Sequence, residues 1–283
     1  MSSPARPVTR LDKTETLAGL FAVWDDIDTL MASVGAEQWR QPSPLPGWCV
    51  QDLVSHIIGT ESMMAGVPTP DLGVDAATLT HVRNPIGELN ECWTRHLSQE
   101  PAAAMMTRYR DITVQRRATL TALADDEWNA VTATPAGPDT YGRFMRIRTF
   151  DCWMHEHDIR QALDLAPSDA DLAGAPTTQA LDEIAACMGF VVGKRGKAPD
   201  GARVAIELTG PVARTIRVAV DGKAGVVDHF GGTAPTTTIT MDGLQFTRLC
   251  GGRPVFDDRP ADVAYGGDDE VGRRIVEHLD YVI

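Results

Sequence analysis

The sequence predicts a helical domain followed by a smaller α+β domain, and three observations support this fold class. The chain has 283 residues, which is too long for one ordinary helical bundle and about right for two domains of roughly 100–200 residues each. From residue 9 to about residue 193, apolar residues recur at helical spacing. Between residues 201 and 241 they alternate with polar residues, as in strands. We therefore expect a helical domain, a helix with a linker, and an α+β domain over residues 1–175, 176–200 and 201–283.

The expected helices of the first part are separated by loops that contain proline and glycine. Leu17, Leu20 and Trp24 begin an apolar stripe at three- and four-residue steps in the first helix. QPSPLPGW and TPAGPDT carry no such period and predict loops, as does the longer stretch over residues 66–84. The expected helices cover residues 9–34, 49–65, 85–124 with an interruption near Pro101, 141–165 and 177–192.

The second part carries strand patterns and short helices. RVAIELTG and RTIRVAVDG alternate apolar and polar residues and are separated by a turn that contains Gly210 and Pro211, which predicts a β-hairpin. TTTITMDG predicts a further strand that leads into a helix, DGLQFTRLC, and DDEVGRRIVEHL predicts a last helix. We expect these elements to form a small mixed α/β sheet domain.

The composition excludes several classes of protein. The formal net charge of −13 repels a phosphate backbone, so we expect no nucleic-acid binding and no anionic membrane surface as a partner. No apolar run approaches the ~18 residues that a membrane helix needs. The first residues, MSSPARPVTR, lack the apolar core of a secretory signal. The five cysteines are odd in number and form no CxxC, which is typical of a reduced, cytoplasmic protein.

The expected helix over residues 141–165 places charged side chains on the face that should be buried. With about 100° per residue, Asp151, His155 and Asp158 fall in the same half of the helix as Phe150 and other apolar residues. A helical bundle buries such a face. Buried carboxylates and imidazoles are costly unless they are paired or bound to metal. A cation among Asp151, Asp158 and Glu61, which belongs to the expected helix over residues 49–65, would explain part of the chain's acidity.

The spacing of two of these residues indicates a more specific role. Asp151 and His155 are four residues apart, which sets two ligand side chains next to each other on one helix face, as in helical zinc sites. The alternative is an ion-pair cluster without metal. In that cluster Arg148 pairs with Asp151, and Asp158 supports His155.

The expected helix over residues 49–65 offers two further candidates. His56 lies just beyond the edge of its apolar stripe. It is either a third metal ligand or an ordinary core or surface histidine. Glu61 falls near the centre of the stripe. It is either a buried partner for an arginine, or a group that orients a ligand or acts as a general base.

Three segments carry a family resemblance that covers nearly the whole chain. LPGWCVQDLVSHIIGTE is similar to the second helix of DinB-like bundles. RFMRIRTFDCWMHEHDIRQAL resembles the fourth-helix signature of the mycothiol-dependent maleylpyruvate isomerase family, of general form D-x-x-x-H-E-x-D-I-R. GDDEVGRRIVEHL resembles the C-terminal domain of that family, which is similar to sterol carrier protein type 2. The resemblance implies a DinB-like up-down four-helix bundle followed by a sterol-carrier-like domain.

The resemblance also implies a metal site. Its ligands in this chain are His56, Asp151 and His155, which bind a divalent ion that is most often zinc. Several relatives have glutamate in place of Asp151, and the donor set also suits nickel, iron or manganese. We expect Asp158 to orient His155 and Glu61 to handle a proton.

The function that the resemblance implies is thiol chemistry on a small molecule. Metal-coordinated thiols are deprotonated, and family members use mycothiol, the low-molecular-weight thiol of actinobacteria. Its thiolate adds to an electrophilic substrate, which leads to cis–trans isomerisation or to S-transfer. Two alternatives stay open. The first is a non-enzymatic binding or regulatory module that the metal stabilises. The second is a hydrolase in which metal-bound water is the nucleophile.

Two arginines of the second domain are candidates for substrate binding. Arg253 and Arg259 lie in the expected loop GGRPVFDDRP. Either guanidinium could bind a substrate carboxylate with two hydrogen bonds if that loop reaches the site. The alternative is that both are ordinary surface arginines in a polar loop.

Overall fold

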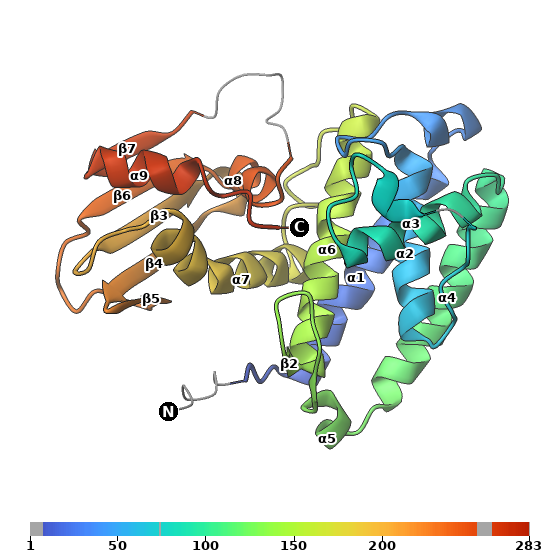
Figure 1. Ribbon diagram of the computed structural model, residues 1–283, viewed down its shortest axis with the longest axis horizontal. Helices are drawn as coiled ribbons and strands as arrows, with labels where there is room; N and C mark the ends of the chain where they lie inside the picture. Colours follow the sequence, from blue (N-terminus) through green and yellow to red (C-terminus); the bar gives the residue numbers. More distant parts are fainter. Residues whose placement is uncertain (1–7, 74, 254–261, 283) are drawn as a thin grey trace. The chain divides into compact units, whose positions relative to one another are not determined.

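The protein forms two compact units, Met1–Pro167 and Ser168–Ile283. The computed structural model (Figure 1) describes residues 8–73, 75–253 and 262–282. The first unit is helical and the second contains a five-stranded sheet with helices. This confirms the predicted fold class. Within the described residues, no helix combines the length and the apolar character that crossing a bilayer requires.

Among the described residues of the first unit, four long helices form a bundle in which each contacts two of the others in a ring. Helix α1 contacts α4 and α6, and α2 contacts the same two helices from the other side (Figure 1). Their bounds are Lys13–Ala32 for α1, Val50–Met64 for α2, Ala102–Ala122 for α4 and Tyr141–Ala162 for α6. Leu20, Ile27 and Leu53 are fully buried between them. The apolar stripes therefore face the centre of the expected four-helix bundle.

A further helix, α3 (Pro85–Leu97), packs against α2. The close approach depends on Gly59, because a Cβ atom there would lie 2.3 Å from the Trp93 ring. Asn84 caps α3 by accepting a hydrogen bond from the backbone of Gly87, with Pro85 in the first turn. The chain breaks before α4 at Pro101, as the sequence predicts.

The connection from α4 to α6 contains more structure than the expected loop. It forms a short helix, α5 (Asp125–Trp128), and a two-stranded antiparallel ribbon of β1 (Val131–Thr132) and β2 (Asp139–Thr140). Such short strands have no room for a periodic pattern, so pairing rather than sequence defines them. The 3₁₀ helices at Ala36–Arg40 and Ala76–Thr78 are also too short to show a periodic apolar pattern, so the sequence does not predict them.

Asp139 joins the start of the chain to the start of α6. Its carboxylate accepts hydrogen bonds from the backbone and the hydroxyl of Thr9 at 2.7 and 2.9 Å, and from the backbone of Thr140 at 2.8 Å. Arg143 Nη1 donates to it at 2.8 Å. Burial alone would raise the pKa of Asp139, but the Arg143 guanidinium and these hydrogen bonds outweigh it and lower the pKa to about 2.

Asp139→Asn is expected to lower the free energy of unfolding by about 2 kcal/mol at pH 7. The folded-state pKa lies below the unfolded one, so this stability is present above about pH 4 and is lost as the pH falls towards 2. The difference in the free energy of unfolding between the wild type and the variant should be roughly half as large at pH 3 as at pH 7. Urea unfolding at several pH values measures it, with Asn in place of the exposed Asp111 as control. A difference that stays constant from pH 7 to 3 would contradict the assignment.

The second unit has a mixed sheet with the strand order β5-β4-β3-β6-β7. Strands β3 and β4 form the predicted antiparallel hairpin, and β6 runs parallel to β3. Ile206 pairs with Ile216 on one side and with Ile239 on the other, and all three are buried. The strands are β3 (Arg203–Thr209), β4 (Arg214–Asp221), β5 (Lys223–Val226), β6 (Thr237–Asp242) and β7 (Ala264–Gly267).

In the described part of the second unit, three helices pack on this sheet. Helix α7 (Ala175–Phe190) contacts β4 and β5, α8 (Gly243–Cys250) contacts β3 and β6, and α9 (Asp269–Val276) contacts β6 and β7. A π-helical turn, Val191–Arg195, ends α7. Helices α8 and α9 begin with aspartate caps, Asp242 and Asp268, whose carboxylates accept backbone hydrogen bonds. Helix α7 belongs to the second unit together with the sheet.

Candidate metal centre

Helices α2 and α6 bring three candidate metal ligands together. His56 comes from α2, and Asp151 and His155 lie one turn apart on α6. His56 Nε2 is 3.0 Å from Asp151 Oδ2, and His155 Nε2 is 3.5 Å from Asp151 Oδ1. One ligand atom from each residue lies within 4.8 Å of the other two. The three residues named from the sequence therefore converge.

These distances fit a divalent ion. Zinc bonds of about 2.0–2.2 Å in a tetrahedral site separate neighbouring ligand atoms by roughly 3.3–3.6 Å. The two carboxylate–imidazole distances of 3.0 and 3.5 Å lie close to this range. Two imidazole nitrogens and one carboxylate oxygen form a donor set that zinc uses in catalytic sites. All three ligand atoms lie within 4.8 Å of one another, so the side chains would have to close around one ion to bind it together.

The cluster is open on the side of its carboxylate. The side chains of His56 and His155 are 7% and 6% exposed, whereas that of Asp151 is 30% exposed. The imidazole rings meet edge to face, with their centroids 4.8 Å apart. An ion held here would therefore have room for a further ligand from solvent, which distinguishes catalytic from closed structural sites.

The charges around the cluster favour the ligand forms of Asp151 and His56, whereas they favour the protonated ring of His155, whose proton a metal ion would have to displace. Burial alone would raise the pKa of Asp151, but the Arg148 guanidinium and the two histidines outweigh it and hold the pKa well below its usual range. Burial lowers the pKa of His56 and favours the neutral ring. Burial opposes charge on His155 too, but the carboxylate of Asp151, with help from that of Asp158, raises its pKa.

Asp158 lies where it can orient His155. Its Oδ2 is 3.1 Å from His155 Nδ1, and the carboxylate is fully buried. A hydrogen bond from Nδ1 leaves the lone pair on Nε2, the nitrogen that faces Asp151. Asp158 is therefore within hydrogen-bond distance of His155, and its supporting role stays a prediction.

Glu61 is a buried partner of two arginines, which is one of the two roles the sequence left open. Its carboxylate is fully buried and accepts from Arg116 Nε at 3.0 Å and from Arg148 Nε at 2.9 Å. Arg148 also donates to Asp151, and Arg116 donates to Tyr141 at 3.1 Å. Arginine charges, not a cation at the triad, therefore balance Glu61. This corrects the expectation that a cation explains its burial.

Sequence reasoning missed Arg116, although a signal for it exists. Met105, Tyr109 and Ile112 form the buried stripe of α4 at helical spacing, and Arg116 continues it with 1% exposure. A basic residue within an apolar stripe of α4 complements an acidic residue within that of α2. Arg148 links this buried pair to the candidate ligands, because it donates to both Glu61 and Asp151.

The two arginines expected to bind substrate belong to the second unit. Arg253 follows α8, is 9% exposed and donates through Nη1 to the carbonyl of Gly251 at 2.6 Å. It is therefore buried and not a surface arginine, contrary to the alternative given above. Arg259 lies outside the described residues.

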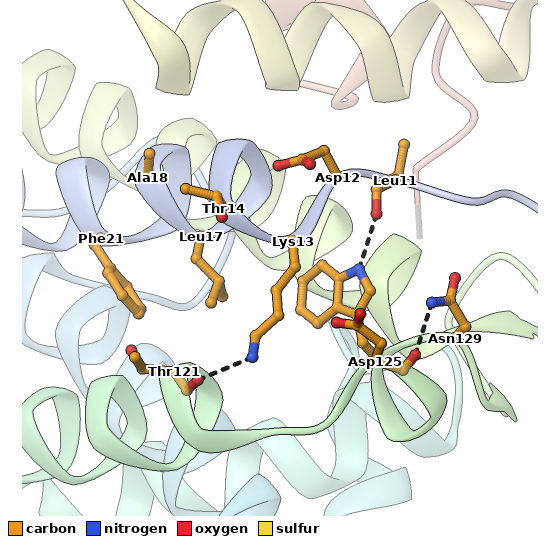
Figure 2. A pocket seen from close by; sticks show the side chains of 11 residues that line it. Leu11, Asp12, Lys13, Thr14, Leu17, Ala18, Phe21, Thr121, Asp125 and Asn129 are labelled. Atoms are coloured by element: carbon orange, nitrogen blue, oxygen red, sulfur yellow. Dashed lines mark hydrogen bonds between the residues drawn. The ribbon is translucent and has the colours of Figure 1, made fainter.

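A pocket in the first unit lies apart from the candidate ligands. It has a volume of about 690 Å³ and is lined by the start of α1, the end of α4 and α5 (Figure 2). Lys13 reaches across it and donates to the carbonyl of Thr121 in the last turn of α4 (Figure 2). It also donates to the carbonyl of Leu123, which follows α4. A lysine that satisfies the last carbonyls of a helix serves as a helix cap. The lining includes none of the expected site residues.

Fold and site together define a two-domain protein with a two-histidine, one-carboxylate cluster inside a four-helix bundle. The family model of the mycothiol maleylpyruvate isomerase N-terminal domain matches residues 20–160. The model of the C-terminal domain of the same family matches residues 178–274. Together the two matches span most of the chain, and the chain belongs to the mycothiol-dependent maleylpyruvate isomerase family.

Individual relatives are distant. The uncharacterized proteins Rv0036c and MT0041, from two strains of Mycobacterium tuberculosis, are each 26% identical over 169 residues, which cover 60% of this chain and 61% of theirs. The match thus spans about three fifths of these relatives. The crystal structure of the mycothiol-dependent maleylpyruvate isomerase superposes on this chain with a TM-score of 0.57 and 15% sequence identity. The superposition covers 90% of this chain and 93% of the isomerase chain. A mutant of that enzyme gives the same TM-score at 14% identity. These likenesses show the fold.

Proposed function

We propose that this protein is a metal- and mycothiol-dependent enzyme that acts on an electrophilic small molecule. The reaction is cis–trans isomerisation of the maleylpyruvate type or S-transfer. The single observation that carries the proposal is the convergence of His56, Asp151 and His155 at a cluster open to solvent, in a chain of this family. The donor set suits zinc first, and nickel, iron or manganese as alternatives.

The residues of the chain provide binding and orientation. His56, Asp151 and His155 would hold the ion. A divalent ion with a free coordination position lowers the pKa of a bound thiol and favours its thiolate. Asp158 keeps the His155 ring turned towards the centre. The open side next to Asp151 admits the thiol and the substrate, whereas the buried histidine side excludes water.

Arg148 and Glu61 hold Asp151 in place through a chain of hydrogen bonds. Arg148 contacts Asp151 and is fixed by Glu61, which is fully buried between two guanidinium groups. We therefore assign Glu61 a positioning role and do not assign it proton transfer, because substrate would have to displace an arginine to reach it. Arg253 and Arg259 stay candidates for binding a substrate carboxylate.

Thiol dependence tests this function. The zinc-loaded protein is incubated with maleylpyruvate, with and without mycothiol, and the loss of substrate and the products are followed by chromatography. We expect conversion only when both zinc and mycothiol are present, and its loss on chelation. Conversion that ignores the thiol would support a metal-assisted hydrolase instead. Binding of zinc and thiol with no conversion of this or other conjugated electrophiles would support the non-enzymatic module.

A further inference from the structure

Trp48 covers both histidines of the candidate centre. Its ring centroid lies 5.6 Å from that of His56 and 6.3 Å from that of His155, tilted by 40° and 36°. The residue is partly exposed and lies two positions before the start of α2, next to the N-cap Cys49. An indole in this position shields the two imidazoles from water and restricts the rotation of both rings.

One carboxylate holds this indole in place. Trp48 Nε1 donates to Glu91 Oε1 at 2.7 Å, and the Glu91 side chain on α3 is 5% exposed. Arg95 Nε donates to the other oxygen, Oε2, at 3.2 Å. Burial alone would raise the pKa of Glu91, but the hydrogen bonds from Trp48, His81 and Arg95 outweigh it and lower the pKa. Glu91 is thus a carboxylate at neutral pH and a strong acceptor for the indole.

The same oxygen of Glu91 also binds the segment that follows α2. His81 Nε2 is 2.7 Å from Glu91 Oε1. The His81 ring lies directly over Gly47, where a Cβ atom would be 2.9 Å from Nδ1 and where φ is +84°. A glycine is therefore required beneath the ring for both space and backbone conformation. His81 belongs to the long stretch that the sequence predicts as a loop, within which the structure shows a 3₁₀ helix at Ala76–Thr78.

We propose that Glu91 is a positioning residue of the metal centre. Through Trp48 it fixes the imidazole ligands, and through His81 it anchors the segment over residues 75–83 beside the indole. This inference rests on the metal centre proposed above. Residues that hold metal ligands in place typically change metal affinity by 10–100-fold when they are removed. Because Glu91 acts through Trp48, we expect about tenfold, the lower end of that range.

Cobalt binding and hydrogen exchange, both measured on the whole protein, test the two roles of Glu91 separately. In Glu91→Ala the affinity for Co²⁺ should fall about tenfold and the visible absorption of the bound ion should change, because the ligand geometry is looser. Hydrogen exchange at residues 75–83 should become faster. Trp48→Phe keeps a ring but loses the N–H donor, so it should reproduce the cobalt effects and leave exchange unchanged. His81→Ala should do the reverse.

Arg95→Ala is the matched control, since Arg95 binds the other oxygen of the same carboxylate and is 45% exposed. It should leave both the cobalt spectrum and the exchange unchanged. If Glu91→Ala and Trp48→Phe give the wild-type spectrum and affinity, Glu91 does not position the centre. If Glu91→Ala does not fold, Trp48→Phe and His81→Ala decide alone. A wild type that binds no Co²⁺ would overturn the metal centre itself, which is a different result.

Discussion

His155→Ala is expected to lower the affinity for zinc by roughly 10²–10³-fold, so that the variant purifies without stoichiometric metal. Structural zinc sites with four ligands bind with about 10–16 kcal/mol, or about 2.5–4 kcal/mol per ligand, and each 1.4 kcal/mol corresponds to about a factor of ten. His155 supplies one of three converging ligand atoms, so its loss leaves an incomplete site. Metal content by mass spectrometry and competition with a chelating dye measure the change.

His96→Ala is the control for this prediction, because His96 is exposed at the end of α3 and lies outside the cluster. It should bind zinc as the wild type does. His56→Ala and Asp151→Ala should behave like His155→Ala. Equal metal content in wild type and all three ligand variants would return these residues to the ion-pair interpretation.

Glu61→Ala is expected to destabilise the first unit by about 3–5 kcal/mol. The change leaves Arg116 and Arg148 with 1% and 3% exposure and without the carboxylate that both of them contact. Removing one member of a buried ion pair is costly because the remaining charge stays in a medium that solvates it poorly. Chemical unfolding followed by far-ultraviolet circular dichroism measures the loss.

Glu100→Ala is the control for the Glu61→Ala prediction, because it removes a carboxylate from an exposed ion pair. Glu100 pairs with Arg108 at 2.6 Å, but the Arg108 side chain is 50% exposed. Exposed pairs contribute about 0–1 kcal/mol. If Glu61→Ala costs no more than Glu100→Ala, the buried arrangement of Glu61 between two arginines is wrong. Glu61→Gln, which keeps the shape and the acceptor oxygen, should cost less than Glu61→Ala.

The sequence predicts those helices and strands that are long enough to show a regular spacing of apolar residues. The stripe that begins with Leu17, Leu20 and Trp24 predicts α1 to within a few residues at each end. Strands β5 and β7 were missed because KAGV and AYGG are short, contain glycine and do not alternate. Both are edge strands that take their conformation from a single neighbour.

The same difference between local pattern and tertiary packing applies to the candidate site. Asp151 and His155 are neighbours because of helical spacing, which the sequence alone shows. The approach of His56 depends on the packing of α2 against α6 and required the family resemblance. The contact between Trp48 and Glu91 joins residues 43 positions apart through a side-chain hydrogen bond. No local pattern marks such a pair, so only the three-dimensional structure shows it.

Crystals of the protein grown with zinc show whether His56, Asp151 and His155 bind one metal ion, by an anomalous difference map at the zinc absorption edge. We expect one strong peak about 2.0–2.2 Å from His56 Nε2, His155 Nε2 and a carboxylate oxygen of Asp151. The present contact of 3.0 Å between His56 Nε2 and Asp151 Oδ2 should then open slightly to admit the ion. A map without a peak between these residues, at zinc concentrations that saturate binding in solution, would show that they do not form the metal site.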